Sequence, residues 1–119
     1  MEKVIGIGGV FFRSTDPDAL RAWYADHLGV DGIPVWHQDA GYTVFQPHAA
    51  DTDYFPSDRQ WMINFRVKDL NAMIAQLKQA DIAVETRVEW DMPEVGRFAR
   101  IHDPEGNPVE LWEPATPSD

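Results

Sequence analysis

The sequence predicts an α+β fold in a single domain, built from two diverged copies of one strand–helix–strands unit. The chain has 119 residues, a length that suits one domain. Residues 9–13 align with residues 62–66, and each segment ends in an arginine three residues before an aspartate that opens a helix. Residues 43–47 align in the same way with residues 110–114. This repeated order indicates two equivalent modules side by side, each with a helix on one face of its sheet.

The first copy begins with a strand predicted over residues 4–14, where β-branched and aromatic residues alternate. Residues 15–17 (TDP) are typical of a helix start, with a capping side chain followed by a proline in the first turn. The helix is predicted to end at Gly29, in the left-handed position that glycine favours. Its apolar stripe consists of Leu20, Trp23, Tyr24, His27 and Leu28.

Two short strands, over residues 34–37 and 42–46, complete the first copy. The second copy is predicted to hold a strand over residues 61–67, a helix opened by Asp69, and further strands over 82–88, 97–102 and 109–112. We therefore divide the domain, residues 1–114, into module one (1–47), a polar connector (48–60) and module two (61–114). Residues 115–119 are predicted to be a disordered tail.

Composition narrows the classes of function. The net charge of −10, without a cluster of lysines or arginines, disfavours nucleic-acid and membrane partners. The absence of cysteine removes disulfides and thiolate chemistry. The N-terminus is too short and too acidic for a signal peptide, and no apolar run is long enough to span a membrane, so we expect a cytoplasmic location. Five tryptophans favour a pocket or an interface.

Four segments carry a family resemblance that covers nearly the whole chain. They are FFRxxDP from Phe11, WYxxxLG from Trp23, MINFRVxDL from Met62 and DPEGNxxELW from Asp103. In this order and spacing, the chain resembles the glyoxalase/bleomycin-resistance/extradiol-dioxygenase superfamily, also called vicinal-oxygen-chelate proteins. The resemblance implies paired βαβββ modules whose sheets form an open cup with the helices outside. It also implies a homodimer, because family members of this size commonly form one.

Strand alternation separates the residues that face the cup from those that face the helices. Aromatic walls with a few convergent polar groups are what a small-molecule site requires. The predicted ligand-binding residues are Phe11, Asn64, Arg66, Phe98, Arg100 and Trp112, with Glu110 beside them as the candidate catalytic residue.

The resemblance also implies where a metal would bind. Metal-dependent members use His, Glu or Gln at four equivalent cup positions, which align here with Gly9, Thr43, Met62 and Glu110. Only Glu110 is a strong ligand for a hard divalent ion, and one carboxylate does not hold such an ion. We therefore expect no metal and no other cofactor, and the alternative is one divalent ion.

Two side chains have competing interpretations. Glu110 is either a general acid or base or a remnant of the ligand position that bonds Arg100 or Asn64. Arg100 either clamps an anionic ligand or forms an ion pair with Glu110.

Two segments outside the predicted strands could also contribute. The loop over residues 89–96, with Trp90 and Met92, is either a lid over the cup or a packing element. Tyr54 and Phe55 in the connector are interpreted as interface residues.

The resulting function hypothesis is a metal-independent member of the superfamily that binds a small, partly aromatic or anionic organic molecule. Whether it transforms that molecule is left open. One alternative is a divalent-metal-dependent lyase or dioxygenase of glyoxalase type. The other is a non-catalytic module that sequesters a small molecule.

Overall fold

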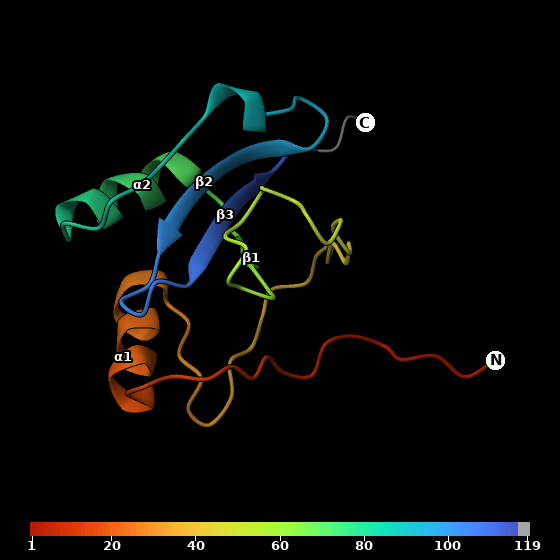
Figure 1. The fold of residues 1–119 in the computed structure, drawn as a ribbon, viewed down its shortest axis with the longest axis horizontal. Coiled ribbons are helices and arrows are strands. Elements are labelled where there is room, and N and C mark those ends of the chain that lie inside the picture. Colours follow the sequence, from red (N-terminus) through yellow and green to blue (C-terminus); the bar gives the residue numbers. More distant parts are fainter. Residues whose placement is uncertain (117–119) are drawn as a thin grey trace.

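Two helices and a three-stranded sheet form the α+β core of residues 1–116, the part of the chain that the computed structural model describes (Figure 1). The elements in chain order are α1 (Pro17–Leu28), β1 (Ile63–Arg66), α2 (Leu70–Gln79), a short 3₁₀ helix (Val88–Trp90), β2 (Gly96–His102) and β3 (Pro108–Pro114). None of the described helices is both long and apolar enough to cross a membrane. The last three residues of the predicted tail lie outside the described residues.

Both helix starts are confirmed. Asp16 accepts a hydrogen bond from the Ala19 backbone N–H at 3.2 Å, and Asp69 accepts one from Ala72 at 3.0 Å. Each aspartate thereby satisfies a backbone donor that has no partner within the helix. Gly29 ends α1 in the left-handed conformation, with φ of 72°.

Strand β3 lies between the other two strands and determines how they align. It pairs in parallel with β1 and antiparallel with β2. Glu110 on β3 is directly opposite both Asn64 on β1 and Arg100 on β2. Two positions along, Trp112 is opposite Arg66 and Phe98. These two rows cross the sheet on the same face.

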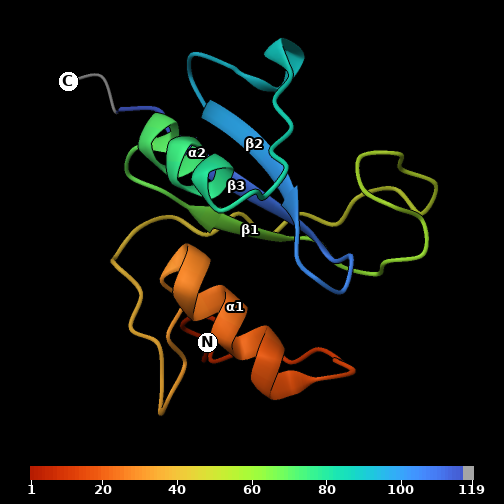
Figure 2. The same ribbon diagram turned by 90° about the vertical axis from the view of Figure 1, so that its left-hand side faces the viewer.

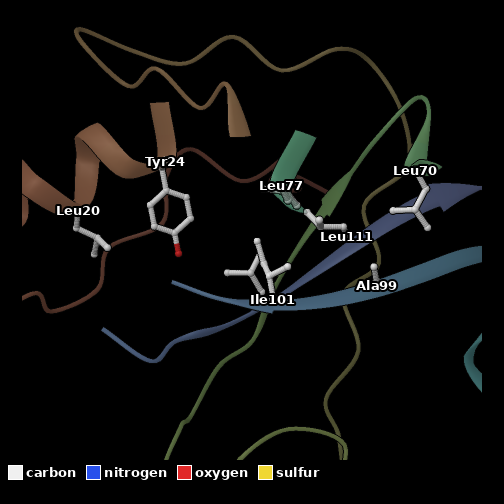
Figure 3. Packing of buried hydrophobic residues seen from close by; sticks show 8 residues of the cluster. Leu20, Tyr24, Leu70, Leu77, Ala99, Ile101 and Leu111 are labelled. Carbon is white, nitrogen blue, oxygen red and sulfur yellow. The ribbon is translucent and has the colours of Figure 1, made fainter. Parts of the chain in front are cut away.

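Helix α2 covers the other face of the sheet, α1 lies beside it next to β1, and the two helices and the sheet enclose the core (Figures 2 and 3). Helix α1 adds Tyr24, whose hydroxyl donates a 2.7 Å hydrogen bond to the buried carboxylate of Asp103 in the β2–β3 turn. Burial and then this carboxylate raise the pKa of the Tyr24 hydroxyl. The bond therefore joins the first half of the chain to the second. The core residues are Leu20, Tyr24, Leu70, Leu77, Ala99, Ile101, Val109 and Leu111.

The strands predicted for the first half, over residues 4–14, 34–37 and 42–46, are not formed, and these predictions are wrong for the single chain. A strand requires a partner edge for its hydrogen bonds, and none lies beside these segments within residues 1–116. Figure 1 shows the N-terminal segment running away from the sheet. The first half therefore contributes one helix, and a second βαβββ module is not seen.

The strand predicted over residues 82–88 is also wrong. Only Glu85 pairs with β2, through two 2.8 Å backbone hydrogen bonds with Arg100. The chain then turns into the 3₁₀ helix Val88–Trp90, which removes the next residues from the sheet edge.

Replacing Tyr24 with phenylalanine removes the bond to Asp103 and keeps the ring. We expect Y24F to lower the free energy of unfolding by roughly 1–3 kcal/mol, as for hydrogen bonds to a buried charge. Urea denaturation followed by circular dichroism measures this change. Y42F, at an exposed tyrosine, is the matched control. Equal stability of Y24F and the wild type would contradict this role of the bond.

Candidate functional site

Asn64, Glu110 and Arg100 form a row across the sheet on the face opposite the helices. Their neighbours along the strands, such as Ala99 and Leu111, belong to the core on the helix side. Arg100 and Glu110 are each only 6% exposed, although both carry a charge. Buried charged groups are retained only with partners. The partners of these two therefore indicate what the row can bind.

Both oxygens of the Glu110 carboxylate accept hydrogen bonds. The Asn64 side-chain amide donates to one oxygen at 2.7 Å, and the Tyr54 hydroxyl donates to the other. Tyr54 comes from the connector, far from β3 in sequence. The carboxylate is thus held by two neutral donors.

Arg100 has a different set of partners and makes no ion pair with Glu110 within the described residues. Its guanidinium donates to the Tyr54 backbone carbonyl at 2.9 Å. It also lies 5.1 Å from the centre of the Tyr54 ring and 5.2 Å from that of Trp90, both within cation–π range. Its Nε atom is buried without a hydrogen-bond partner. The ion-pair interpretation of Arg100 is therefore wrong, and the guanidinium keeps a free donor.

Aromatic side chains form the second row. Phe98 and Trp112 stack with their ring centroids 6.1 Å apart and an interplanar angle of 3°. The Trp112 indole N–H donates to the Val95 carbonyl at 2.9 Å, which fixes the orientation of the ring. Gly96 allows this close approach, because its φ is +133° and an added Cβ would meet Trp112 and the Glu113 carbonyl.

The 89–96 loop is tied to the strands at several points. Asp91 accepts a 3.0 Å hydrogen bond from the Phe98 backbone, and the Val95 carbonyl accepts another from Ala115. Trp90 extends from this loop over Arg100. The loop therefore covers part of the row as a packed element.

Two predicted ligand-binding residues do not reach the row. Phe11 is 96% exposed in the extended N-terminal segment, because the strand that would turn it inward is not formed. Arg66 donates instead to the backbone carbonyls of Asp39, at 2.8 Å, and Ala40, at 3.3 Å. The structure thus brings together Asn64, Phe98, Arg100, Glu110 and Trp112, leaves Phe11 outside, and engages the Arg66 guanidinium with residues 39–40 although Arg66 stands at the end of the second row.

Sequence reasoning missed Tyr54, which it assigned to an interface. The available signal was its aromatic ring in an otherwise polar connector, but no pattern places a loop residue against a sheet. Burial, and then the hydrogen bond to Glu110, raise the pKa of Tyr54 to about 12, while Arg100 opposes the shift.

The residues at the four inherited metal positions do not fit a divalent ion. Gly9 and Thr43 lie in exposed segments outside the sheet, and Met62 precedes β1. Glu110 already uses both oxygens for Asn64 and Tyr54. Among the described residues, no three His, Cys, Asp or Glu side chains gather into a possible metal site.

A separate cleft of about 290 Å³ lies between the helices and β1. Its wall is mainly apolar, and Arg66, Lys68 and Asp69 lie at the same opening. It is not lined by Glu110 or Arg100. The cleft is therefore distinct from the row, and we centre the candidate site on the row, which holds two of the buried charged side chains, Arg100 and Glu110.

No protein-family model and no curated protein matches the chain. Several solved structures are similar to it, and two of them come from one Streptomyces strain. TnmS3, an antibiotic binding protein from Streptomyces sp. CB03234, is 21% identical over 85% of this chain and 88% of its own, with a TM-score of 0.49. A glyoxalase/bleomycin resistance protein from the same organism is 21% identical over 83% of this chain and 92% of its own, with a TM-score of 0.46. The function is therefore inferred from the residues of this chain.

The raised pKa of Tyr54 can be measured by ultraviolet titration of tyrosine ionisation. We expect the difference between the wild-type and Y54F curves to have its midpoint near pH 12. Because the folded pKa exceeds the ordinary value of 10.0, the stability contributed by this hydroxyl is complete below pH 10.0 and is lost as the pH rises towards 12. A midpoint near 10 would show that the phenol is neither buried nor held by Glu110.

Proposed function

We propose that this protein is a metal-independent member of the glyoxalase/bleomycin-resistance/dioxygenase superfamily that binds a small, partly aromatic or anionic organic molecule. The ligand would lie over the row of Asn64, Glu110 and Arg100. The observation that carries the proposal is the buried Arg100 guanidinium, whose Nε has no hydrogen-bond partner and which pairs with no carboxylate among residues 1–116. The sequence segments described above support the family.

A buried cation without a counter-ion is unfavourable unless something compensates it. Here, the compensation comes from one carbonyl and two ring faces, which leave a hydrogen-bond donor free. A carboxylate or phosphate group would supply both the missing charge and the missing acceptor. Arg100 therefore favours an anionic group on the ligand.

The aromatic part of the proposed ligand is supported by the surroundings of Arg100. Trp90 and Tyr54 lie on the guanidinium, and the Phe98–Trp112 stack forms the next row of the same face. Planar rings pack favourably against such side chains at centroid distances of about 4.5–7 Å. An aromatic acid matches both parts of the site.

Metal independence is part of the proposal, because the inherited positions supply a single carboxylate. The rival is a divalent-metal-dependent lyase or dioxygenase of glyoxalase type. Elemental analysis of the purified protein separates the two. Stoichiometric Ni, Zn, Mn or Fe would favour the rival.

Whether the ligand is transformed distinguishes an enzyme from a sequestering module. Glu110 is the acidic side chain of the row, and any proton transfer to or from the ligand would use it. Its two neutral donors equally suit a purely binding role. Tight binding without turnover across a panel of aromatic acids would favour sequestration.

We further propose that the protein acts as a homodimer and that dimerisation completes the predicted pair of βαβββ modules. The extended segments 4–12 and 40–46 expose alternating apolar residues and contain no charged side chain. In the single chain, the outer edge of β1 has no partner among residues 1–116. An exposed apolar segment and an open edge favour pairing with another chain. A second copy of the chain supplies a strand edge for the apolar segments and a strand for the open edge of β1.

The exposed area is large enough for such an interface. The aromatic residues of these segments, Phe11, Phe12, Tyr42 and Phe45, are 50–96% exposed. Together they leave on the order of 600 Å² uncovered, taking roughly 200 Å² for each side chain. A standard interface buries about 800 Å² per partner. Because these segments are uncharged, the net charge of −10 does not act directly against their association.

A cytoplasmic location is the remaining part of the proposal. It is supported by the absence of cysteine from the sequence, which suits a reducing compartment.

Replacing Arg100 with alanine should weaken the binding of an anionic ligand far more than that of a neutral one. With benzoate and benzamide as matched probes, we expect R100A to lose roughly 10–100-fold in affinity for benzoate and under threefold for benzamide. Isothermal titration calorimetry measures both. R97A, on the same strand, where Arg97 bonds Asn71, is the control. Equal losses for the two probes would contradict an anion-binding role.

Sedimentation equilibrium tests the homodimer. We expect the wild type to have twice the mass of one chain at micromolar concentration. We expect the dimer dissociation constant of F11S/F45S to be at least tenfold higher, because this variant loses two apolar contacts. V88S, at an exposed apolar residue outside these segments, should behave as the wild type. A monomeric wild type, or an equal effect of V88S, would refute the proposed interface.

A further inference from the structure

Tyr54 occupies the centre of the proposed site as a bound molecule would. Its hydroxyl donates to Glu110, and its ring lies on the Arg100 guanidinium, 5.1 Å from the ring centre. The ring also meets Trp90 edge-on, with centroids 6.3 Å apart, and stacks on His48 at 5.7 Å. Every part of the phenol group thus has a partner.

The buried charged groups of the row require hydrogen-bonding and aromatic partners at the position that Tyr54 occupies. Without its hydroxyl, one oxygen of the buried Glu110 carboxylate has no donor, and Arg100 loses a ring and a carbonyl acceptor together. Leaving a buried charged group without a hydrogen bond is strongly unfavourable. A ligand that enters here must therefore bring a hydroxyl or N–H donor to Glu110 and a flat ring to Arg100.

The connector that carries Tyr54 is suited to moving away. Residues 48–60 contain no helix or strand, and their backbone hydrogen bonds are local turns, such as Thr52 to Ala49 and Arg59 to Pro56. The bonds that tie the connector to the rest of the chain include the hydroxyl and carbonyl of Tyr54 itself, and one from Arg59 to the Glu105 carbonyl. Segments with few external bonds open locally at low free energy.

The geometry points to Tyr54 as an internal occupant of the ligand site and to phenols as the class of ligand that displaces it. This inference rests on the proposed function, because it places the ligand over the same row. The hydroxyl of the incoming phenol donates to Glu110, and its ring takes the place of the Tyr54 ring between Arg100 and Trp90. The connector then swings away from the sheet.

Two consequences follow from this exchange. The wild type binds a phenol more weakly than the empty site would, because the site is open for only a fraction of the time. Binding also releases residues 48–58 from the sheet, so the local turns that hold the Thr52 and Tyr54 amides loosen and these amides lose protection. A ligand without a hydroxyl or N–H donor leaves Glu110 unsatisfied, so it neither displaces Tyr54 nor releases the connector.

Hydrogen–deuterium exchange of the wild-type protein tests the release. The probes are phenol, anisole, which lacks the donor, and benzoate. We expect saturating phenol to bind and to increase exchange in residues 48–58 at least threefold, and anisole to leave it unchanged. Phenol that fails to bind the wild type, or that binds without this increase, would overturn the inference.

Isothermal titration calorimetry of Y54A tests the competition. We expect Y54A to bind phenol at least tenfold more tightly than the wild type does, and at least tenfold more tightly than it binds anisole. V88A, at an exposed apolar residue outside the proposed dimer interface, should match the wild type. Equal gains for phenol and anisole would identify an unselective cavity and would overturn the inference. Because the exchange measurement uses the wild type, the test holds even where Y54A does not fold.

Benzoate separates this inference from the proposed function on which it rests. Binding of benzoate through Arg100, with no binding of phenol to the wild type, would overturn the role of Tyr54 and leave the proposed function intact. Failure of all three probes with both proteins would overturn both.

Discussion

The pairing of β3 with strands on both sides is the constraint on which the rest of the structure depends. Because β1 runs parallel to β3 and β2 runs antiparallel to it, Asn64, Glu110 and Arg100 meet in one row. A shift of either neighbour by one residue would turn its side chains to the other face. The core prevents that shift, since Val109 and Leu111 on β3 and Ile101 on β2 are almost fully buried against the helices. Apolar packing on one face therefore fixes the polar row on the other.

The helices could be predicted from the sequence because their signals are local. Asp16, Gly29 and Asp69 act within one turn of the helix end that they define. Three strands of module two, β1, β2 and β3, also followed from alternation, because their partners lie in the same half of the chain, whereas the strand predicted over residues 82–88 is reduced to the single bridge at Glu85. The first-half strand over residues 4–14 has the same alternation, but a strand also requires an edge with which to pair. That edge is a tertiary or intermolecular feature, which periodicity does not contain.

The candidate site shows the same division between local and distant information. Alternation placed Arg100, Glu110 and Trp112 on the open face, since side-chain direction follows from position in a strand. It failed for Phe11, whose strand is not formed, and it could not find Tyr54. A connector residue reaches Glu110 only through the path of the whole loop. The residue that completes the hydrogen bonding of the row was therefore the hardest to predict.

The separation of the two buried charges of the row, Arg100 and Glu110, links the two proposals about the ligand. An ion pair between Arg100 and Glu110 would satisfy both groups and leave little for a ligand to bind. Instead, Glu110 is held by two neutral donors, while Arg100 is held by one carbonyl and two rings. Each charge therefore keeps its own requirement, a donor for Glu110 and an acceptor for Arg100. An aromatic ring with a hydroxyl directed at Glu110 and a negative group directed at Arg100 meets both requirements at once. Tyr54 supplies the first of these groups and not the second, so a ligand that carries both has an advantage over the residue that it displaces.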